Sequence, residues 1–194
     1  MRIPAVLLGL ALVVLALRVL NSRPELALSS AELPEPTYAP FEVQTASGAL
    51  SLADLRGQAV VVYFGYTSCP DICPTTLATV GSAVKKLPPE QGDQVTALFV
   101  SVDPERDALD RIDDYARYFH PRFRAGTASP SKLRSIADDW GVYYRREETE
   151  SALSYGVDHS TQAFLVDAAG RMVRQVPHGT SSRDWARLLR EAIP

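Results

Sequence analysis

Two cysteines, Cys69 and Cys73, are the only ones in the 194-residue sequence, and three residues separate them. A disulfide across so short a loop would restrict the unfolded chain little, so the pair would be a weak structural crosslink. Three intervening residues let both sulfurs reach one metal ion and still permit a disulfide when the metal is absent. The pair therefore indicates metal or redox chemistry.

The flanking sequence places this pair at the end of a strand. Residues 59–66 form a continuous run of β-branched and aromatic residues, typical of a strand buried on both faces. Pro74 suits the first turn of a helix, which we expect over residues 75–87. Cys73 then lies at the helix start, where the partial positive charge favours a thiolate, although Asp71 opposes this effect. Open α/β sheets place their chemistry at this end of a strand.

Three histidines are candidates for a third ligand. His120 ends a predicted helix, where a surface or capping role explains it. His178 follows the last predicted strand in a turn that could still approach the cysteines. His159 directly precedes a core strand, and in a thioredoxin-like arrangement the loop entering that strand faces the cysteine loop. We therefore predict His159 as the third ligand, with Asp158 supporting its loop.

Two thiolates and one imidazole favour copper over other metals. Structural zinc almost always takes four protein ligands, and no fourth is evident. Soft sulfur suits Cu(I), and the imidazole lets the site also accept Cu(II), with water or a weak oxygen completing the set. A blue-copper centre would need a second histidine and usually an axial methionine, but the methionines are Met1 and Met172. We predict a Cu(I)/Cu(II) site at Cys69, Cys73 and His159.

The remaining pattern alternates helices with buried strands and closes with a hairpin and a helix. Such an order predicts an α/β sandwich with a mixed sheet. A short hairpin surrounds Gly48, and Asp107 is predicted to cap the second helix. The expected strands are 95–102, 123–127, 162–167 and 172–176, and the expected helices are 107–119, 131–140 and 182–192.

The N-terminus predicts an exported protein. Residues 3–17 are all apolar, Gly or Pro, and with Arg18 snorkelling the run approaches the length of a membrane span. We favour a membrane anchor over residues 1–21 rather than a cleaved signal, then a Pro-rich tether at 22–40 and a globular domain at 41–194. The segment lacks the Arg-rich and Ser-rich composition of a mitochondrial transit peptide. We therefore expect a single-pass protein of the bacterial inner membrane, with its domain in the periplasm.

The net charge of -3 gives no reason to expect a nucleic-acid partner, because such partners select a clustered basic face.

Three motifs carry a resemblance to a known family: GlyTyrThrSerCysProAspIleCysPro at 65–74, SerValAspProGluArgAsp at 101–107 and TyrGlyValAspHisSer at 155–160. The chain resembles the Sco/SenC family of copper-binding, thioredoxin-like assembly factors for cytochrome c oxidase. The resemblance implies a thioredoxin-like, peroxiredoxin-type mixed sheet flanked by helices, with an N-terminal β-hairpin. It also implies that Cys69, Cys73 and His159 bind copper, while we assign Asp103 and Pro104 a role in shaping their loop.

The resemblance further implies the partner. A metallochaperone of this family delivers copper to the binuclear copper centre of cytochrome c oxidase subunit II, or reduces the cysteines of that centre beforehand. A periplasmic copper donor would load it.

Three other functions use the same features. A thiol–disulfide oxidoreductase rests on Cys69 and Cys73, although their spacing exceeds Cys-x-x-Cys and it needs no histidine. A peroxidase would use Thr67 and a distant arginine, but the sequence before Cys69 lacks the expected proline. A structural interaction domain explains neither the close pair nor its position. We expect a carrier rather than a turnover enzyme, with thiol–disulfide exchange left open.

Overall fold

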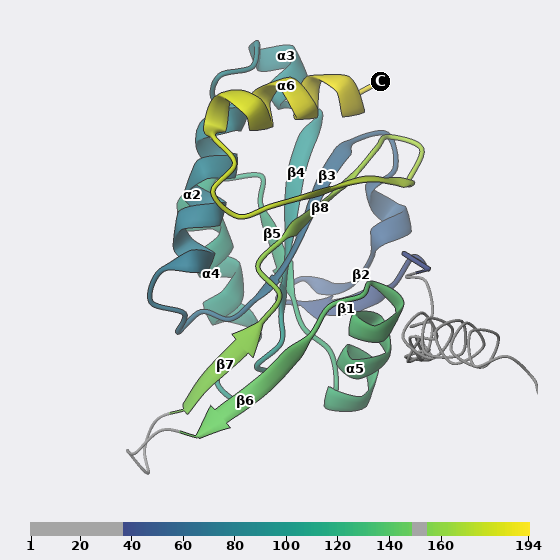
Figure 1. The fold of residues 1–194 in the computed structure, drawn as a ribbon. Coiled ribbons are helices and arrows are strands. Elements are labelled where there is room, and N and C mark those ends of the chain that lie inside the picture. The colour runs from purple at the N-terminus through teal and green to yellow at the C-terminus, as the bar shows by residue number, and fades with distance from the viewer. Residues whose placement is uncertain (1–36, 149–154) are drawn as a thin grey trace, which may run out of the picture. The chain divides into compact units, whose positions relative to one another are not determined.

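The computed structural model describes residues 37–148 and 155–194, and its centre is a five-stranded mixed sheet (Figure 1). The strand order is β5-β4-β3-β8-β9, in which β3, β4 and β5 are parallel, β8 runs antiparallel to β3, and β9 runs antiparallel to β8. The predicted mixed sheet is confirmed. The strands are β3 (Ala59–Gly65), β4 (Val95–Ser101), β5 (Arg124–Gly126), β8 (Ala163–Val166) and β9 (Met172–Val176).

Strands β3 and β4 form the buried middle of the sheet. Every residue of both strands is buried, as expected for apolar runs covered on both faces. They pair in parallel from Ala59 opposite Val95 to Gly65 opposite Ser101, so both strands end at the same level. The segments that follow them therefore begin side by side, and these segments carry the cysteine motif and the 101–107 motif.

Helices cover one face of the sheet and a helix with a hairpin covers the other. On the first face, α2 (Ile72–Val84), α4 (Leu109–Phe119) and α6 (Ser182–Ala192) contribute buried apolar residues to one core cluster. On the second face, α5 (Pro130–Asp139) packs with the N-terminal hairpin in another cluster. This hairpin confirms the expected one; it comprises β1 (Glu42–Thr45) and β2 (Gly48–Ser51), followed by the 3-10 helix η1 (Leu52–Leu55).

A two-stranded ribbon, which the sequence did not predict, carries the third candidate ligand. It pairs β6 (Tyr144–Glu148) with β7 (Tyr155–His159) as a separate antiparallel sheet and projects away from the central sheet (Figure 1). Strand β6 is largely exposed and rich in charge, and β7 is only partly buried, so neither strand shows the apolar alternation that marks a strand in sequence. A short helix, α3 (Pro89–Gly92), was also not predicted.

Two predicted helix starts differ from the structure. Helix α2 begins at Ile72, three residues before the predicted start, so Cys73 and Pro74 both lie in its first turn. The prediction that Asp107 caps the second helix was wrong. The N-cap of α4 is Ala108, and Asp107 is only 1% exposed because its carboxylate is used inside the domain.

The predicted anchor and most of the predicted tether lie outside the described residues. In the part of the chain that the structure describes, no helix is long and apolar enough to cross a membrane. Residues 37–40, which we assigned to the tether, contact the domain instead. The backbone N–H of Tyr38 donates to the Asp139 carbonyl (2.9 Å), and the indole N–H of Trp140 donates to the Ala39 carbonyl (2.9 Å).

Candidate metal centre

The structure brings Cys69, Cys73 and His159 together at the end of β3. Their ligand atoms all lie within 4.8 Å of one another, and Cys73 Sγ lies 3.4 Å from His159 Nε2. Among the described residues, this is the group of three or more cysteine, histidine or acidic side chains that could hold a metal ion. All three predicted ligands are therefore in one place, although 86 positions separate Cys73 from His159.

Each ligand is held by a different element. Cys69 lies in the loop after β3, where its backbone N–H donates to the Tyr66 carbonyl (3.3 Å), and its side chain is half-buried. Cys73 lies in the first turn of α2 and is fully buried. A Cβ atom at Gly65 would lie 2.6 Å from Cys73 Sγ, so the last residue of β3 must lack a side chain for the sulfur to occupy this position.

The environment of His159 presents its free nitrogen to the sulfurs. Its Nδ1 lies 2.8 Å from the Ser160 carbonyl oxygen, which can only accept a hydrogen bond, so Nδ1 carries the proton. The lone pair of Nε2 then faces Cys73. The rings of Tyr63 and Tyr66 meet the imidazole edge-on, with centroids 6.4 and 5.8 Å away. A hydrogen bond that selects the tautomer is the usual support of a metal-binding histidine.

The pKa values of the two thiols are shifted in opposite directions. A hydrogen bond from the Cys73 thiol lowers the pKa of Cys69 to about 4 despite partial burial, helped by the backbone N–H groups of Cys73 and Asp71. The same hydrogen bond, together with burial, raises the pKa of Cys73. In the metal-free reduced protein, Cys69 is therefore the thiolate and Cys73 the thiol. A metal ion bound by both sulfurs must displace the Cys73 proton.

Tyr63 is a neighbour of the site that sequence reasoning missed. Its hydroxyl donates to Cys73 Sγ at 3.8 Å, and burial raises the pKa of Tyr63, so the hydroxyl stays protonated. It lies inside the buried strand β3, where its sequence context indicates only a core residue.

Asp107 is the second residue that was missed, because we had assigned it to a helix cap. Its carboxylate accepts hydrogen bonds from the Thr67 backbone N–H (2.9 Å), the Thr67 hydroxyl (2.6 Å) and the Ser101 hydroxyl (2.6 Å). The Thr67 hydroxyl also accepts from Arg111 Nε (2.9 Å). Thr67, which the peroxidase hypothesis would use, is thus engaged with Asp107 and anchors the start of the cysteine loop.

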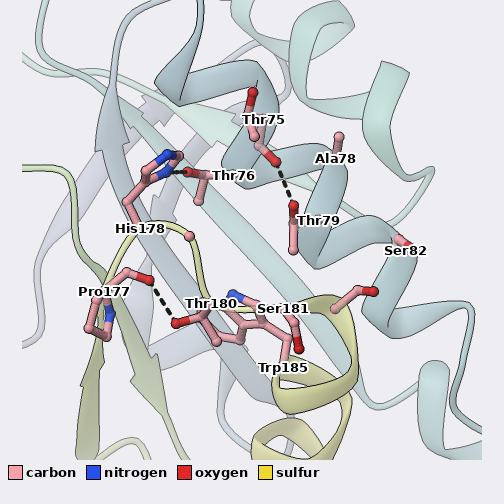
Figure 2. A pocket seen from close by; sticks show the side chains of 12 residues that line it. Thr75, Thr76, Ala78, Thr79, Ser82, Pro177, His178, Thr180, Ser181 and Trp185 are labelled. Atoms are coloured by element: carbon pink, nitrogen blue, oxygen red, sulfur yellow. Dashed lines mark hydrogen bonds between the residues drawn. The ribbon is translucent and has the colours of Figure 1, made fainter.

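The other two histidines have separate surroundings. His178 Nδ1 lies 3.0 Å from the Thr76 hydroxyl, at the rim of a groove of about 520 Å³ between α2 and the start of α6 (Figure 2). His120 Nδ1 accepts a hydrogen bond from the Arg122 backbone N–H (3.4 Å), and burial lowers the pKa of His120. Neither residue belongs to the cysteine cluster.

The spacing of the three donor atoms suits one metal ion. With metal–sulfur bonds of about 2.3 Å and metal–imidazole bonds of about 2.0 Å, the donors of a trigonal site are roughly 3.7–4.0 Å apart. The Cys73 Sγ to His159 Nε2 distance of 3.4 Å needs only a small adjustment to reach this geometry. Two sulfurs and one nitrogen are donors that soft or borderline metals prefer.

Comparisons with a family model and with known proteins point to the same family. The model of the SCO1/SenC family matches residues 29–194. The SCO2-like protein RP587 of Rickettsia prowazekii is 33% identical over 153 residues, which are 78% of this chain and 74% of that protein. The mitochondrial SCO1 homolog 1 of Arabidopsis thaliana is 38% identical over 121 residues, or 62% of this chain. The chain spans only 36% of that relative's length.

Solved structures share the fold. The copper-bound ScoI of Bradyrhizobium japonicum superposes with a TM-score of 0.72 at 29% identity, covering 80% of this chain and 98% of that one. The apo Sco1 of Thermus thermophilus gives a TM-score of 0.70 at 35% identity, with coverages of 82% and 92%. The fold is therefore the thioredoxin-like one expected from the sequence motifs.

Proposed function

The chain belongs to the SCO1/SenC family, and from this premise we propose that it carries one copper ion on Cys69, Cys73 and His159. The observation that supports this proposal is the convergence of two sulfurs and one imidazole nitrogen within 4.8 Å. The copper-bound state of the Bradyrhizobium ScoI, which shares the fold, supports copper as the metal. The two sulfurs suffice for Cu(I), and the imidazole adds the donor that Cu(II) requires.

We propose that the copper is cargo for the binuclear centre of cytochrome c oxidase subunit II. The partial exposure of Cys69 supports a transfer role, because an incoming ligand can reach the metal from that side while Cys73 stays buried. A three-coordinate site also leaves room for a fourth, incoming donor during exchange.

We place the site outside the cytoplasm. The apolar run at residues 3–17 supports a membrane anchor over 1–21, in a bacterial inner membrane with the domain in the periplasm. A copper donor in the same compartment would load the protein.

The split acidity of the cysteines favours a second candidate function, reduction of the target's disulfide. The Cys69 thiolate would attack one target sulfur, forming a mixed disulfide and releasing the other target sulfur as a thiolate. Cys73, after losing its proton to solvent, would then attack Cys69 Sγ and release the second target thiolate. Two electrons pass to the target, and the protein is left with a Cys69–Cys73 disulfide.

The deciding experiment loads the full-length protein in detergent with one equivalent of Cu(I). The loaded protein is then mixed with an apo, reduced subunit II fragment. We expect copper to move to the fragment, measured by the copper content of the two proteins after separation, and we expect Cys69→Ser, Cys73→Ser and His159→Ala to lower copper retention. His120→Ala and His178→Ala are matched controls, because both histidines lie outside the cluster. Binding that is unchanged in Cys69→Ser and Cys73→Ser would contradict the ligand assignment.

The same reagents separate delivery from reduction. Metal-free, reduced protein is mixed with the oxidised fragment, and free thiols on the fragment are counted by mass spectrometry after alkylation. Rapid reduction without copper transfer to the reduced fragment would favour the reductase. Transfer without reduction would favour the metallochaperone.

A further inference from the structure

The segment that follows β4 contacts both of the chain segments that carry the candidate ligands. It contains two buried carboxylates, Asp103 (5% exposed) and Asp107 (1% exposed). Neither belongs to the metal cluster. Buried carboxylates are costly unless they are fully hydrogen-bonded, so their partners show what the segment stabilises.

Asp107 ties this segment to the cysteine loop. Both hydrogen bonds from Thr67, through its backbone N–H and its hydroxyl, end on the Asp107 carboxylate. Thr67 lies two residues before Cys69. The hydroxyl of Ser101 donates to Oδ2, the same oxygen that accepts from the Thr67 backbone N–H, so the carboxylate joins the end of β4 to the start of the cysteine loop.

Asp103 ties the same segment to the strand that ends in His159. The Tyr155 hydroxyl donates to Asp103 Oδ1 (2.6 Å), and Arg106 Nε donates to Asp103 Oδ2 (2.5 Å). Arg106 Nη1 donates to the Tyr155 carbonyl (2.8 Å), and its guanidinium lies 3.6 Å from the centroid of the Tyr155 ring. The guanidinium of Arg146 lies over the other face of the same ring, 3.7 Å from the ring centroid. Tyr155 is therefore held at its hydroxyl, its carbonyl and its ring.

This contact matters because Val157 is the only buried residue of strand β7. The strand belongs to the two-stranded ribbon rather than to the central sheet, and such a ribbon is marginally stable by itself. Tyr155 and His159 lie four residues apart on the same face of β7, about 13 Å along the strand. A shift of the strand at Tyr155 would therefore carry the imidazole with it.

We propose that Asp103, Arg106 and Asp107 form a brace that sets the distance between His159 and the cysteines. Asp107 positions Cys69 through Thr67, and Asp103 with Arg106 positions His159 through Tyr155. The consequence for copper affinity rests on the proposed function. It falls mainly on Cu(II), because the two thiolates can retain Cu(I) without the imidazole.

The test uses Tyr155→Phe in the full-length protein, which removes one hydroxyl and keeps the ring between the two guanidinium groups. We expect Cu(II) affinity to fall about tenfold, as for other outer residues that orient a metal-binding histidine, while Cu(I) affinity changes much less. The Cu(II) electron paramagnetic resonance spectrum should lose nitrogen hyperfine coupling. Tyr118→Phe, which removes a hydroxyl from an 85% exposed tyrosine on α4, is the control.

A double-mutant cycle with His159→Ala distinguishes positioning from a general structural effect. If Tyr155 acts through the imidazole, Tyr155→Phe causes no further loss of Cu(II) affinity in the His159→Ala protein. Thr67→Val, which acts on the Cys69 arm, should still cause a loss there. An equal effect of Tyr155→Phe in both backgrounds, or none in the wild type, overturns the brace.

A copper-free measurement keeps the brace testable if the proposed function fails. In the proton NMR spectrum of the wild-type protein, the His159 imidazole should show contacts with the rings of Tyr63 and Tyr66, and Tyr155→Phe should weaken these contacts. Failure of the wild type to bind copper would refute the copper proposal alone. An identical imidazole spectrum in both proteins would refute the brace alone.

Discussion

At the scale of single residues, the two cysteines of the site differ in burial and in pKa. Cys69 is partly buried, and its hydrogen bond from Cys73 lowers its pKa to about 4. Cys73 is fully buried, and the same hydrogen bond raises its pKa. An accessible thiolate beside a protected thiol suits both ligand exchange and disulfide exchange, since each begins at the more exposed sulfur.

This inequality predicts the alkylation chemistry of the metal-free, reduced protein. Above pH 5 Cys69 is already a thiolate, so its rate with iodoacetamide should stay nearly constant from pH 5 to 7. The rate of an ordinary cysteine, with a pKa of about 8.5, falls about tenfold for each unit below that value. Peptide mass spectrometry over a pH series measures both cysteines, and Cys73 should react far more slowly. A tenfold fall per unit at Cys69 would contradict the assigned thiolate.

At the scale of elements, the parallel pairing of β3 with β4 aligns the segments that build the site. Because both strands end at the same level, the cysteine loop and the 101–107 segment begin side by side. Asp107 joins them with three hydrogen bonds in a buried position. The loop geometry therefore depends on a residue that follows α2, α3 and β4 in the chain.

Replacing Asp107 should accordingly destabilise the fold. Asp107→Ala removes the acceptor for Thr67 and Ser101 and leaves their donors buried, which should lower the free energy of unfolding by about 2–4 kcal/mol. Urea denaturation followed by circular dichroism measures the change. Asp114→Ala, at an exposed position of helix α4, which follows Asp107, should stay within about 0.5 kcal/mol of the wild type. Equal stability of the Asp107→Ala protein would show that these hydrogen bonds contribute nothing net.

At the scale of the whole molecule, the site joins segments that lie far apart in the sequence. The two cysteines follow β3, and His159 is the last residue of β7 in the ribbon, 86 positions after Cys73. A metal ion bound by all three donors therefore crosslinks the folded state. Binding that prefers the folded chain must raise its stability.

Copper should therefore raise the melting temperature of the protein. With free Cu(I) at 100 times its Kd, the folded state gains about 2.7 kcal/mol, reduced by whatever copper the unfolded cysteines bind. Differential scanning calorimetry with and without a Cu(I) chelator measures the shift. The protein with both cysteines replaced by serine should show none, and His159→Ala should retain a smaller one. A full shift in the double serine variant would place the copper elsewhere.

The local sequence pattern was sufficient to predict several features of this protein. Uninterrupted apolar runs predicted β3 and β4 because strands buried on both faces need no polar alternation. The position of Cys69 and Cys73 after such a run, with Pro74 behind them, placed the pair at a strand end and in a helix start. These inferences use neighbours within about a dozen residues, where sequence spacing and spatial position are closely linked.

The tertiary structure decided the rest, because the deciding contacts join residues far apart in the chain. Strand β6 is exposed and charged and β7 is partly buried, so the ribbon has no apolar pattern of its own. Only the fold shows that it brings Nε2 of His159 within 3.4 Å of Cys73. Asp107 has the spacing of a helix cap, yet burial beside Thr67, 40 residues earlier, gave its carboxylate better partners than the helix N-terminus. The residue types of the donor set are readable in sequence, whereas the distances that make them a site are not.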